Sequence, residues 1–131
     1  MGTPLHLGDL PTPTRLKLAA SALLTVLVTV LLAFAIGEVA GGDLSGLQHL
    51  LQALPLLLLL AAAWRYPRPA GLALIGVGMV LLPVWLLLVF TDRDPALRDI
   101  PIMRWAGTGA LFFLPPLVAG WLLFRAGRRT P

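Results

Sequence analysis

Four polar side chains that could carry chemistry lie close together in an otherwise apolar sequence: Glu38, Gln48, His49 and Gln52. A short connection between two helices would bring Glu38 near His49 and create a carboxylate–imidazole pair. Such a pair can relay protons, because imidazole gains and loses a proton near neutral pH. The alternative is that all four side chains contact water and lipid headgroups at a membrane surface. We favour this second interpretation. If the chain has a ligand or proton site, we expect it at these four residues.

His49 could also bind haem or chlorophyll through one axial nitrogen. The only other histidine, His6, is predicted on the opposite side of the membrane, which argues against a haem held by two histidines. The sequence has no cysteine, so thiolate metal sites and cysteine nucleophiles are excluded. It also has no Ser/His/Asp set, HExxH, P-loop or GxGxxG motif. We therefore predict no catalytic residue, no metal site and no enzymatic activity.

The composition is typical of a membrane protein. Of the 131 residues, 58% are hydrophobic and 12% are charged, against roughly a quarter charged in an ordinary soluble domain. The basic balance, ten Lys and Arg against six Asp and Glu, does not indicate nucleic acid, because these residues flank apolar runs. We expect the lipid bilayer as a partner of this chain and no nucleic acid.

Four apolar runs predict an all-α, antiparallel four-helix bundle that spans the membrane as a single domain of residues 1–131. The expected helices cover about residues 17–36, 47–64, 70–90 and 105–124, after a tail of residues 1–14. At 1.5 Å per residue, about 19 residues cross most of the ~30 Å hydrocarbon core. The first run could instead be a signal peptide cleaved at Ala33-Phe34-Ala35. We predict a retained helix.

Lys and Arg are distributed unevenly between the two sides of the predicted bundle. Seven lie around the start of the first helix, in the turn between the second and third helices and at the C-terminal end, and three lie between the third and fourth helices. Positive residues favour the cytoplasm, so both termini are predicted to be cytoplasmic. Basic and aromatic residues at helix ends are expected to anchor the bundle at the interface: Arg15, Lys17, Trp64, Arg65, Tyr66, Arg68, Trp105, Arg125, Arg128 and Arg129.

Two connections have features of their own. The turn between the second and third helices is only about five residues long, so these helices are expected to be adjacent and antiparallel. Within it, we expect Pro67 to stop the second helix and Pro69 to lie in the first turn of the third. The connection between the third and fourth helices places apolar residues on one face between Asp94 and Met103. It predicts a short amphipathic segment on the outer membrane surface.

Small and hydroxyl-bearing residues recur every four positions along the first helix: Ser21, Thr25, Thr29, Ala33 and Gly37. Such a stripe allows backbones to approach closely and form hydrogen bonds between helices. It can pack inside the bundle, which is our expectation, or onto a partner subunit. Glycines indicate further close packing in the third and fourth helices: Gly71, Gly76, Gly78, Gly107 and Gly109.

No ionisable residue falls in the middle third of any predicted span, although ion-coupled transport normally needs one. Small multidrug exporters are similar in length and hydropathy, but that family carries an essential glutamate inside the first helix, whereas Glu38 lies at its end. We therefore expect a non-catalytic accessory subunit of a larger membrane complex, of respiratory or photosynthetic type, with other membrane subunits as partners. The alternative is a small oligomeric transporter or channel in which the outer polar cluster lines an entrance.

One stretch resembles a known group of sequences. It runs from Glu38 through His49-Leu50-Leu51-Gln52-Ala53-Leu54-Pro55 to Trp64-Arg65-Tyr66-Pro67 and Gly71. These positions are similar to those of small uncharacterised bacterial membrane proteins, which share four spans, a proline in the second helix and a W-R-x-P end. The resemblance implies the four-span fold and a location in the bacterial inner membrane. It implies no particular activity.

Overall fold

The computed structural model describes residues 6–91 and 102–129. Within these ranges the chain is helical and contains no strand, which confirms the predicted all-α fold. In chain order the elements are η1 (Leu7–Asp9), α1 (Thr12–Ala40), η2 (Leu44–Gly46), α2 (Leu47–Arg65), α3 (Pro67–Thr91) and α5 (Ile102–Arg128). The connection that was expected to hold an amphipathic segment, residues 92–101, lies outside the described residues.

Each of the four long helices in the described chain is apolar and long enough to cross a membrane. The qualifying stretches contain 21 to 29 residues, so at 1.5 Å per residue each reaches the ~30 Å thickness of the hydrocarbon core. At most 33% of the residues in the most apolar part of each stretch are buried within the bundle. The remaining apolar surface needs lipid or protein to cover it. The chain is therefore a multi-pass membrane protein.

The N-terminal tail is shorter than the sequence predicted. α1 begins at Thr12, whereas the tail was expected to run to residue 14. A proline in the first turn of α1 is compatible with this early start, because its missing N–H would have no partner there. The Arg15 guanidinium donates to the backbone carbonyls of Gly8 and Leu10. These bonds hold η1 against the start of α1.

A single residue, Tyr66, separates α2 from α3. The second helix stops before Pro67, as predicted: α2 ends at Arg65, and Pro67 is already the first residue of α3. A proline at the first helical position already has a helical φ, while the residue before it is kept out of the α region. Tyr66 accordingly has φ −129° and ψ 65°, and the break between the helices falls there.

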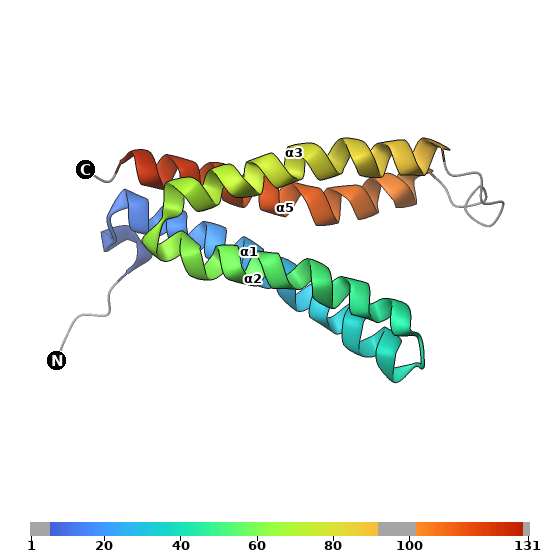
Figure 1. Ribbon diagram of the computed structural model, residues 1–131. Coiled ribbons are helices and arrows are strands. Elements are labelled where there is room, and N and C mark those ends of the chain that lie inside the picture. The colour runs from blue at the N-terminus through green and yellow to red at the C-terminus, as the bar shows by residue number, and fades with distance from the viewer. Residues whose placement is uncertain (1–5, 92–101, 130–131) are drawn as a thin grey trace.

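The four helices form two antiparallel hairpins, α1 with α2 and α3 with α5 (Figure 1). Contacts are more extensive between α3 and α5 than between α2 and α3, and α1 packs against α5 to join the hairpins. The hairpins lie close together at the end that contains Tyr66 and diverge toward the end that contains Glu38 (Figure 1). We name these the Tyr66 end and the Glu38 end.

The buried core follows this arrangement. Toward the Tyr66 end, one cluster draws buried residues from all four helices: Ala20, Leu24, Ala63, Ala70, Leu74, Ala119 and Leu123. Toward the Glu38 end, a second cluster draws its buried residues from α1 and α2, with Phe112 of α5 packed against it: Leu27, Val28, Leu31 and Ala53. The alanines of the first cluster allow helices to approach closely where all four meet.

Candidate functional site

The polar group at the Glu38 end is positioned by the short connection between α1 and α2. α1 ends at Ala40, Gly42 adopts φ 88°, and Asp43 accepts a hydrogen bond from the backbone N–H of Ser45 at 2.8 Å to begin η2. The left-handed φ suits glycine, which has no Cβ to clash with the backbone. This tight reversal brings the first turn of α2 next to Glu38 on α1.

The same connection lowers the pKa of Asp43 below its ordinary value of 3.8. The cause is hydrogen bonding from the side chain and the backbone of Ser45, which favours the carboxylate form. Asp43 is exposed, so its charge remains in contact with water. We interpret Asp43 as the cap that holds the connection in shape.

Gly46 allows α2 to start directly against α1. A Cβ atom at Gly46 would lie 2.8 Å from the carbonyl oxygen of Ala35 and 2.9 Å from the Cβ of Glu38. Contacts this short would force the two helices apart. The lack of a side chain at Gly46 therefore helps to set the separation between Glu38 and the first turn of α2.

His49 lies between the Glu38 carboxylate and the Gln52 amide. Its Nε2 is 3.5 Å from Glu38 Oε1, and its Nδ1 is 3.4 Å from Gln52 Oε1. Both distances exceed those of an ordinary N–H···O hydrogen bond. Each ring nitrogen faces an accepting oxygen, so the doubly protonated imidazolium is the form that donates to both. The structure thus brings three of the four predicted polar residues together.

The pair formed by Glu38 and His49 is partly shielded. The side chain of His49 is 19% exposed and that of Glu38 is 34% exposed. The Phe34 ring lies 5.8 Å from the imidazole and 6.5 Å from the Phe112 ring of α5, measured between centroids. Sequence reasoning missed both rings, although Phe34 lies four residues before Glu38 and therefore shares its helix face. The site can hold opposite charges and can exchange a proton.

The other chemistry considered for these residues has less geometric support. Gln48 is exposed and forms no hydrogen bond with the other three polar residues. Both ring nitrogens of His49 already face an oxygen, so an axial bond to haem or chlorophyll would displace Glu38 or Gln52. Within residues 6–91 and 102–129, no group of three acidic, histidine or cysteine side chains is placed to hold a metal ion.

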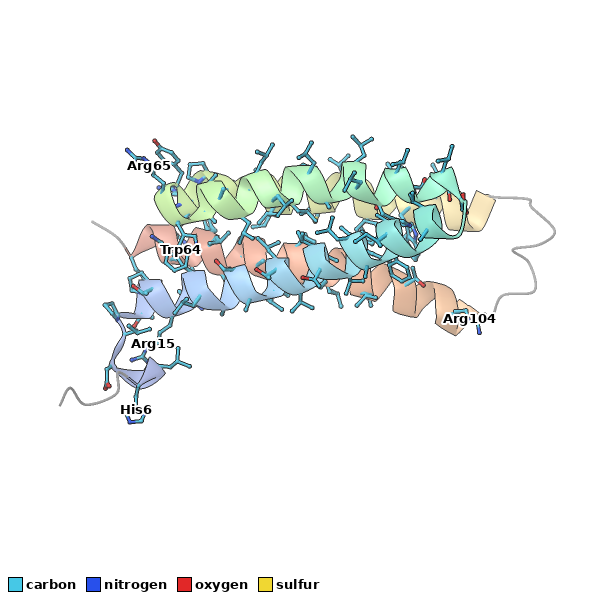
Figure 2. The ribbon with its side chains drawn as sticks, turned by 90° about the horizontal axis from the view of Figure 1, so that it is seen from below. His6, Arg15, Trp64, Arg65 and Arg104 are labelled. Carbon is cyan, nitrogen blue, oxygen red and sulfur yellow. The ribbon has the colours of Figure 1, made fainter. Side chains whose placement is uncertain are left out.

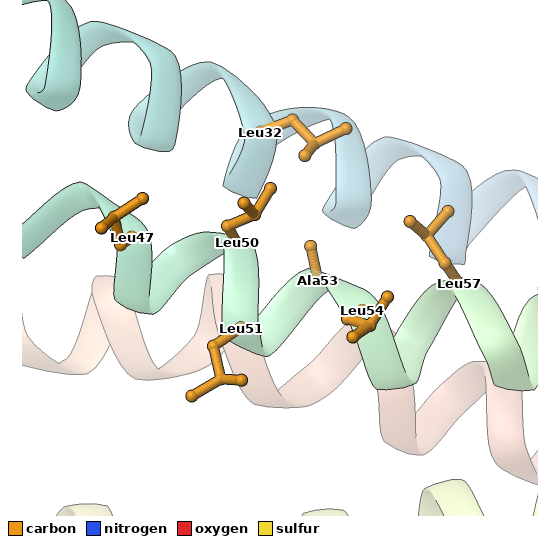
Figure 3. Close-up of a pocket in the computed structure, with 7 residues that line it drawn as sticks. All are labelled: Leu32, Leu47, Leu50, Leu51, Ala53, Leu54 and Leu57. Atoms are coloured by element: carbon orange, nitrogen blue, oxygen red, sulfur yellow. The ribbon is translucent and has the colours of Figure 1, made fainter.

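An open groove lies on the surface between α1 and α2 (Figure 3). Its volume is about 420 Å³, and it is lined by Leu32 of α1 together with Ala53 and five leucines of α2 between Leu47 and Leu57. This lining carries no polar side chain. The groove can therefore accommodate hydrocarbon, such as a lipid acyl chain, but it has no group for chemistry.

The small-residue stripe of α1 lies mostly on the outside of the bundle. Thr25, Thr29, Ala33 and Gly37 are exposed, and Ser21 is partly buried. Four residues turn a helix by about 400°, so the stripe drifts by about 40° at each repeat. The drift carries it away from the core as the helix proceeds. Our expectation that the stripe packs inside the bundle therefore fails for most of its length.

The predicted interface anchors other than Trp105 gather at the Tyr66 end. Figure 2 shows Arg15, Trp64 and Arg65 there, with Arg104 at the opposite end of the bundle. Lys17 Nζ donates to the carbonyl oxygen of Trp64 at 3.2 Å. This bond joins α1 to α2 and places a cation near the C-terminus of α2, where the helix dipole favours it.

Arginines at the Tyr66 end stack on aromatic rings. The distances from guanidinium carbon to ring centroid are 5.9 Å for Arg65 on Tyr66, 4.8 Å for Arg125 on Trp121, and 5.7 and 5.4 Å for Arg68 and Arg128 on Phe124. Sequence reasoning missed Trp121 and Phe124, although each lies four residues before an arginine of the same helix. Arg129 is exposed. Trp105 lies in α5, and its side chain is outside the described part.

The chain matches no family model, no curated protein and no solved structure. The resemblance to small bacterial membrane proteins consequently stays a prediction. The function has to be argued from the residues of this chain.

Proposed function

We propose that this protein is a non-catalytic subunit of a larger membrane assembly and docks through the outward stripe of α1. We define this outward stripe as Thr25, Thr29, Ala33 and Gly37. The observation that carries the proposal is that all four residues are exposed. The buried contacts of α1 come from a different set of residues, so the bundle leaves this stripe free for a partner.

The chemistry of the outward stripe suits a protein partner better than lipid. Small side chains allow the backbone of a second helix to approach closely, and a hydrogen bond between helices is worth about 0.6 kcal/mol. The Thr29 hydroxyl already donates to the carbonyl oxygen of Thr25 at 2.8 Å, so it can only accept a hydrogen bond from a partner helix. A lipid acyl chain has no helix backbone to pack closely and no group that can form a hydrogen bond with threonine. A Cβ added at Gly37 would meet no atom within 4 Å, so this end of the stripe is open. The proposed occupant is a membrane-spanning helix with a small-residue face of its own.

We further propose that the protein resides in the bacterial cytoplasmic membrane with both termini in the cytoplasm. The support comes from the basic residues at the Tyr66 end, where α1 begins and α5 ends (Figures 1 and 2). Of the Lys and Arg in the described residues, only Arg104 lies at the opposite end. The excess of positive charge favours the cytoplasmic side for the Tyr66 end. A respiratory or photosynthetic complex would be a suitable host.

The alternative function, a small oligomeric transporter or channel, is supported by one observation. The Glu38 carboxylate and the His49 imidazole lie 3.5 Å apart at one end of the bundle, where a translocated ion could enter. Liposomes that contain the full chain test this function directly. A flux that disappears in Glu38→Gln and His49→Ala would support it, and a parent protein without flux would remove it.

The docking proposal is tested by purifying the full chain from its own membrane in a mild detergent. Larger residues are introduced into the outward stripe, as Thr29→Leu and Gly37→Leu. The matched controls are Ala73→Leu and Gly76→Leu, which enlarge exposed positions on α3. We expect the parent and the controls to run in a larger complex with the same membrane proteins, and the stripe variants to lose them.

Two results would contradict the docking proposal. The first is a parent chain that runs alone as a monomer. The second is loss of the partners from stripe and control variants alike, which would show a general effect of larger side chains. Circular dichroism in the same detergent checks that each variant keeps its helices.

A further inference from the structure

Two arginines from different helices meet on one aromatic ring at the Tyr66 end. Arg68 lies near the start of α3, and Arg128 is the last residue of α5. The guanidinium carbon of Arg68 is 5.7 Å from the centroid of Phe124, and that of Arg128 is 5.4 Å from it. The two guanidinium carbons are therefore at most about 11 Å apart.

Close contact between the helices holds this arrangement in place. A Cβ atom added at Gly127 would lie 2.6 Å from the Cβ of Arg68 and 2.9 Å from its backbone nitrogen. The start of α3 thus lies directly against the end of α5. Arg128 follows Phe124 by four residues, so it reaches the same ring along its own helix. The site is built from two elements and does not depend on a mobile loop.

The positive charge of these arginines is not neutralised by the described chain. Both side chains are exposed. In residues 6–91 and 102–129 the only close contact between an acidic and a basic side chain joins Glu38 to His49, at the other end of the bundle. The one carboxylate described near this end, Asp9, accepts a hydrogen bond from the backbone of His6. Arg68 and Arg128 can therefore receive an anion without losing an acidic partner.

We propose that Arg68, Arg128 and Phe124 form a binding site for the phosphodiester headgroup of an anionic phospholipid. A guanidinium whose face rests on a ring keeps its N–H groups directed outward at its edge. These groups match the paired oxygens of a phosphate. Residues at the ends of spanning helices lie at headgroup depth, where basic pockets between helices recruit anionic lipids. This site is independent of the docking stripe on α1.

The experiment is native mass spectrometry of the full chain in detergent, titrated with phosphatidylglycerol and, separately, with phosphatidylcholine. The test variant is Arg68→Gln with Arg128→Gln. The matched control is Arg65→Gln with Arg125→Gln, which removes two stacked arginines from the same end. We expect the test variant to bind phosphatidylglycerol about tenfold more weakly, the loss of roughly one charged hydrogen bond. The control should stay within about threefold of the parent, and phosphatidylcholine binding should not change.

Several results would overturn this proposal. An equal loss in the test and control variants would mean that diffuse positive charge, and not this pair, attracts the lipid. Displacement of phosphatidylglycerol by equimolar inorganic phosphate would assign the site to a free anion. Full affinity in Arg68→Lys with Arg128→Lys would show that the planar forks are not used. These lysine variants retain both charges, so they also report on the site if the glutamine variant loses its fold.

Discussion

Gly71 of α3 and Gly120 of α5 pack backbone against backbone. A Cβ atom on Gly71 would lie 2.5 Å from the carbonyl oxygen of Gly120, and one on Gly120 would lie 2.9 Å from the carbonyl oxygen of Gly71. The contact is reciprocal, so each glycine creates the space that the other helix occupies. It explains why α3 and α5 make the most extensive helix contact described in the bundle.

Replacing either glycine of this contact by alanine should separate α3 from α5. We expect Gly71→Ala and Gly120→Ala each to lower the free energy of unfolding by about 1–3 kcal/mol, the range for forcing extra atoms into a packed interior. Unfolding in mixed micelles, followed by helical circular dichroism, provides the measurement. Gly76→Ala is the control, because a Cβ at Gly76 meets no atom within 4 Å. It should leave stability unchanged or raise it, since alanine favours helix.

The shape of the α1–α2 connection should depend on Gly46. Gly46→Ala would push the start of α2 away from Ala35 and Glu38, and we expect a loss of about 1–3 kcal/mol. The reporter is the disulfide formed in a variant with Glu38→Cys and His49→Cys. We expect this disulfide to form readily when Gly46 is present and slowly when Gly46→Ala is added. Gly8→Ala is a suitable control, since it has open space. Unaltered crosslinking would contradict the role given to Gly46.

Glu38 and His49 should show measurable energetic coupling. A double-mutant cycle with Glu38→Gln and His49→Ala is expected to give about 0.5–1 kcal/mol, because both side chains are partly exposed. A coupling energy indistinguishable from zero would contradict a direct interaction between the two side chains.

The cap formed by Asp43 should weaken in acid. The folded state lowers the pKa of this carboxyl, so ionised Asp43 adds stability above the ordinary value of 3.8. That contribution is lost as the pH falls through the lower value of the folded state. Asparagine keeps the accepting oxygen but not the charge. The stability difference between the parent and Asp43→Asn should therefore be present at pH 7 and should shrink as the pH falls below the ordinary pKa of 3.8. A difference that persists in acid would contradict this account.

The number of spans could be predicted because it depends only on local composition. A run of about 20 apolar residues spans a bilayer wherever it occurs. The packed face of α1 could not be predicted in the same way, because apolar residues surround the helix. Leu24 is fully buried while Val26 is 62% exposed, and nothing in their chemistry separates them. The exposed position of the small-residue stripe had to come from the structure.

The two candidate sites also differ in how far the sequence could predict them. The proximity of Glu38 and His49 followed from the short connection between two helices. The contact between Arg68 and Phe124 could not be predicted in this way, because the start of α3 meets the end of α5 only through packing between helices. The sequence also could not predict which glycine of α3 packs against a neighbouring helix. Gly71 and Gly76 are equivalent in the sequence, yet only Gly71 contacts another helix.

The single-residue link at Tyr66 makes this end of the molecule intolerant of insertions. One added residue that continued either helix would rotate α3 by about 100° relative to α2. Arg68 and Gly71 would then no longer face α5. Only Tyr66 separates α2 from α3, so no loop is available to compensate for the rotation. A reporter or affinity tag should therefore not be inserted between α2 and α3.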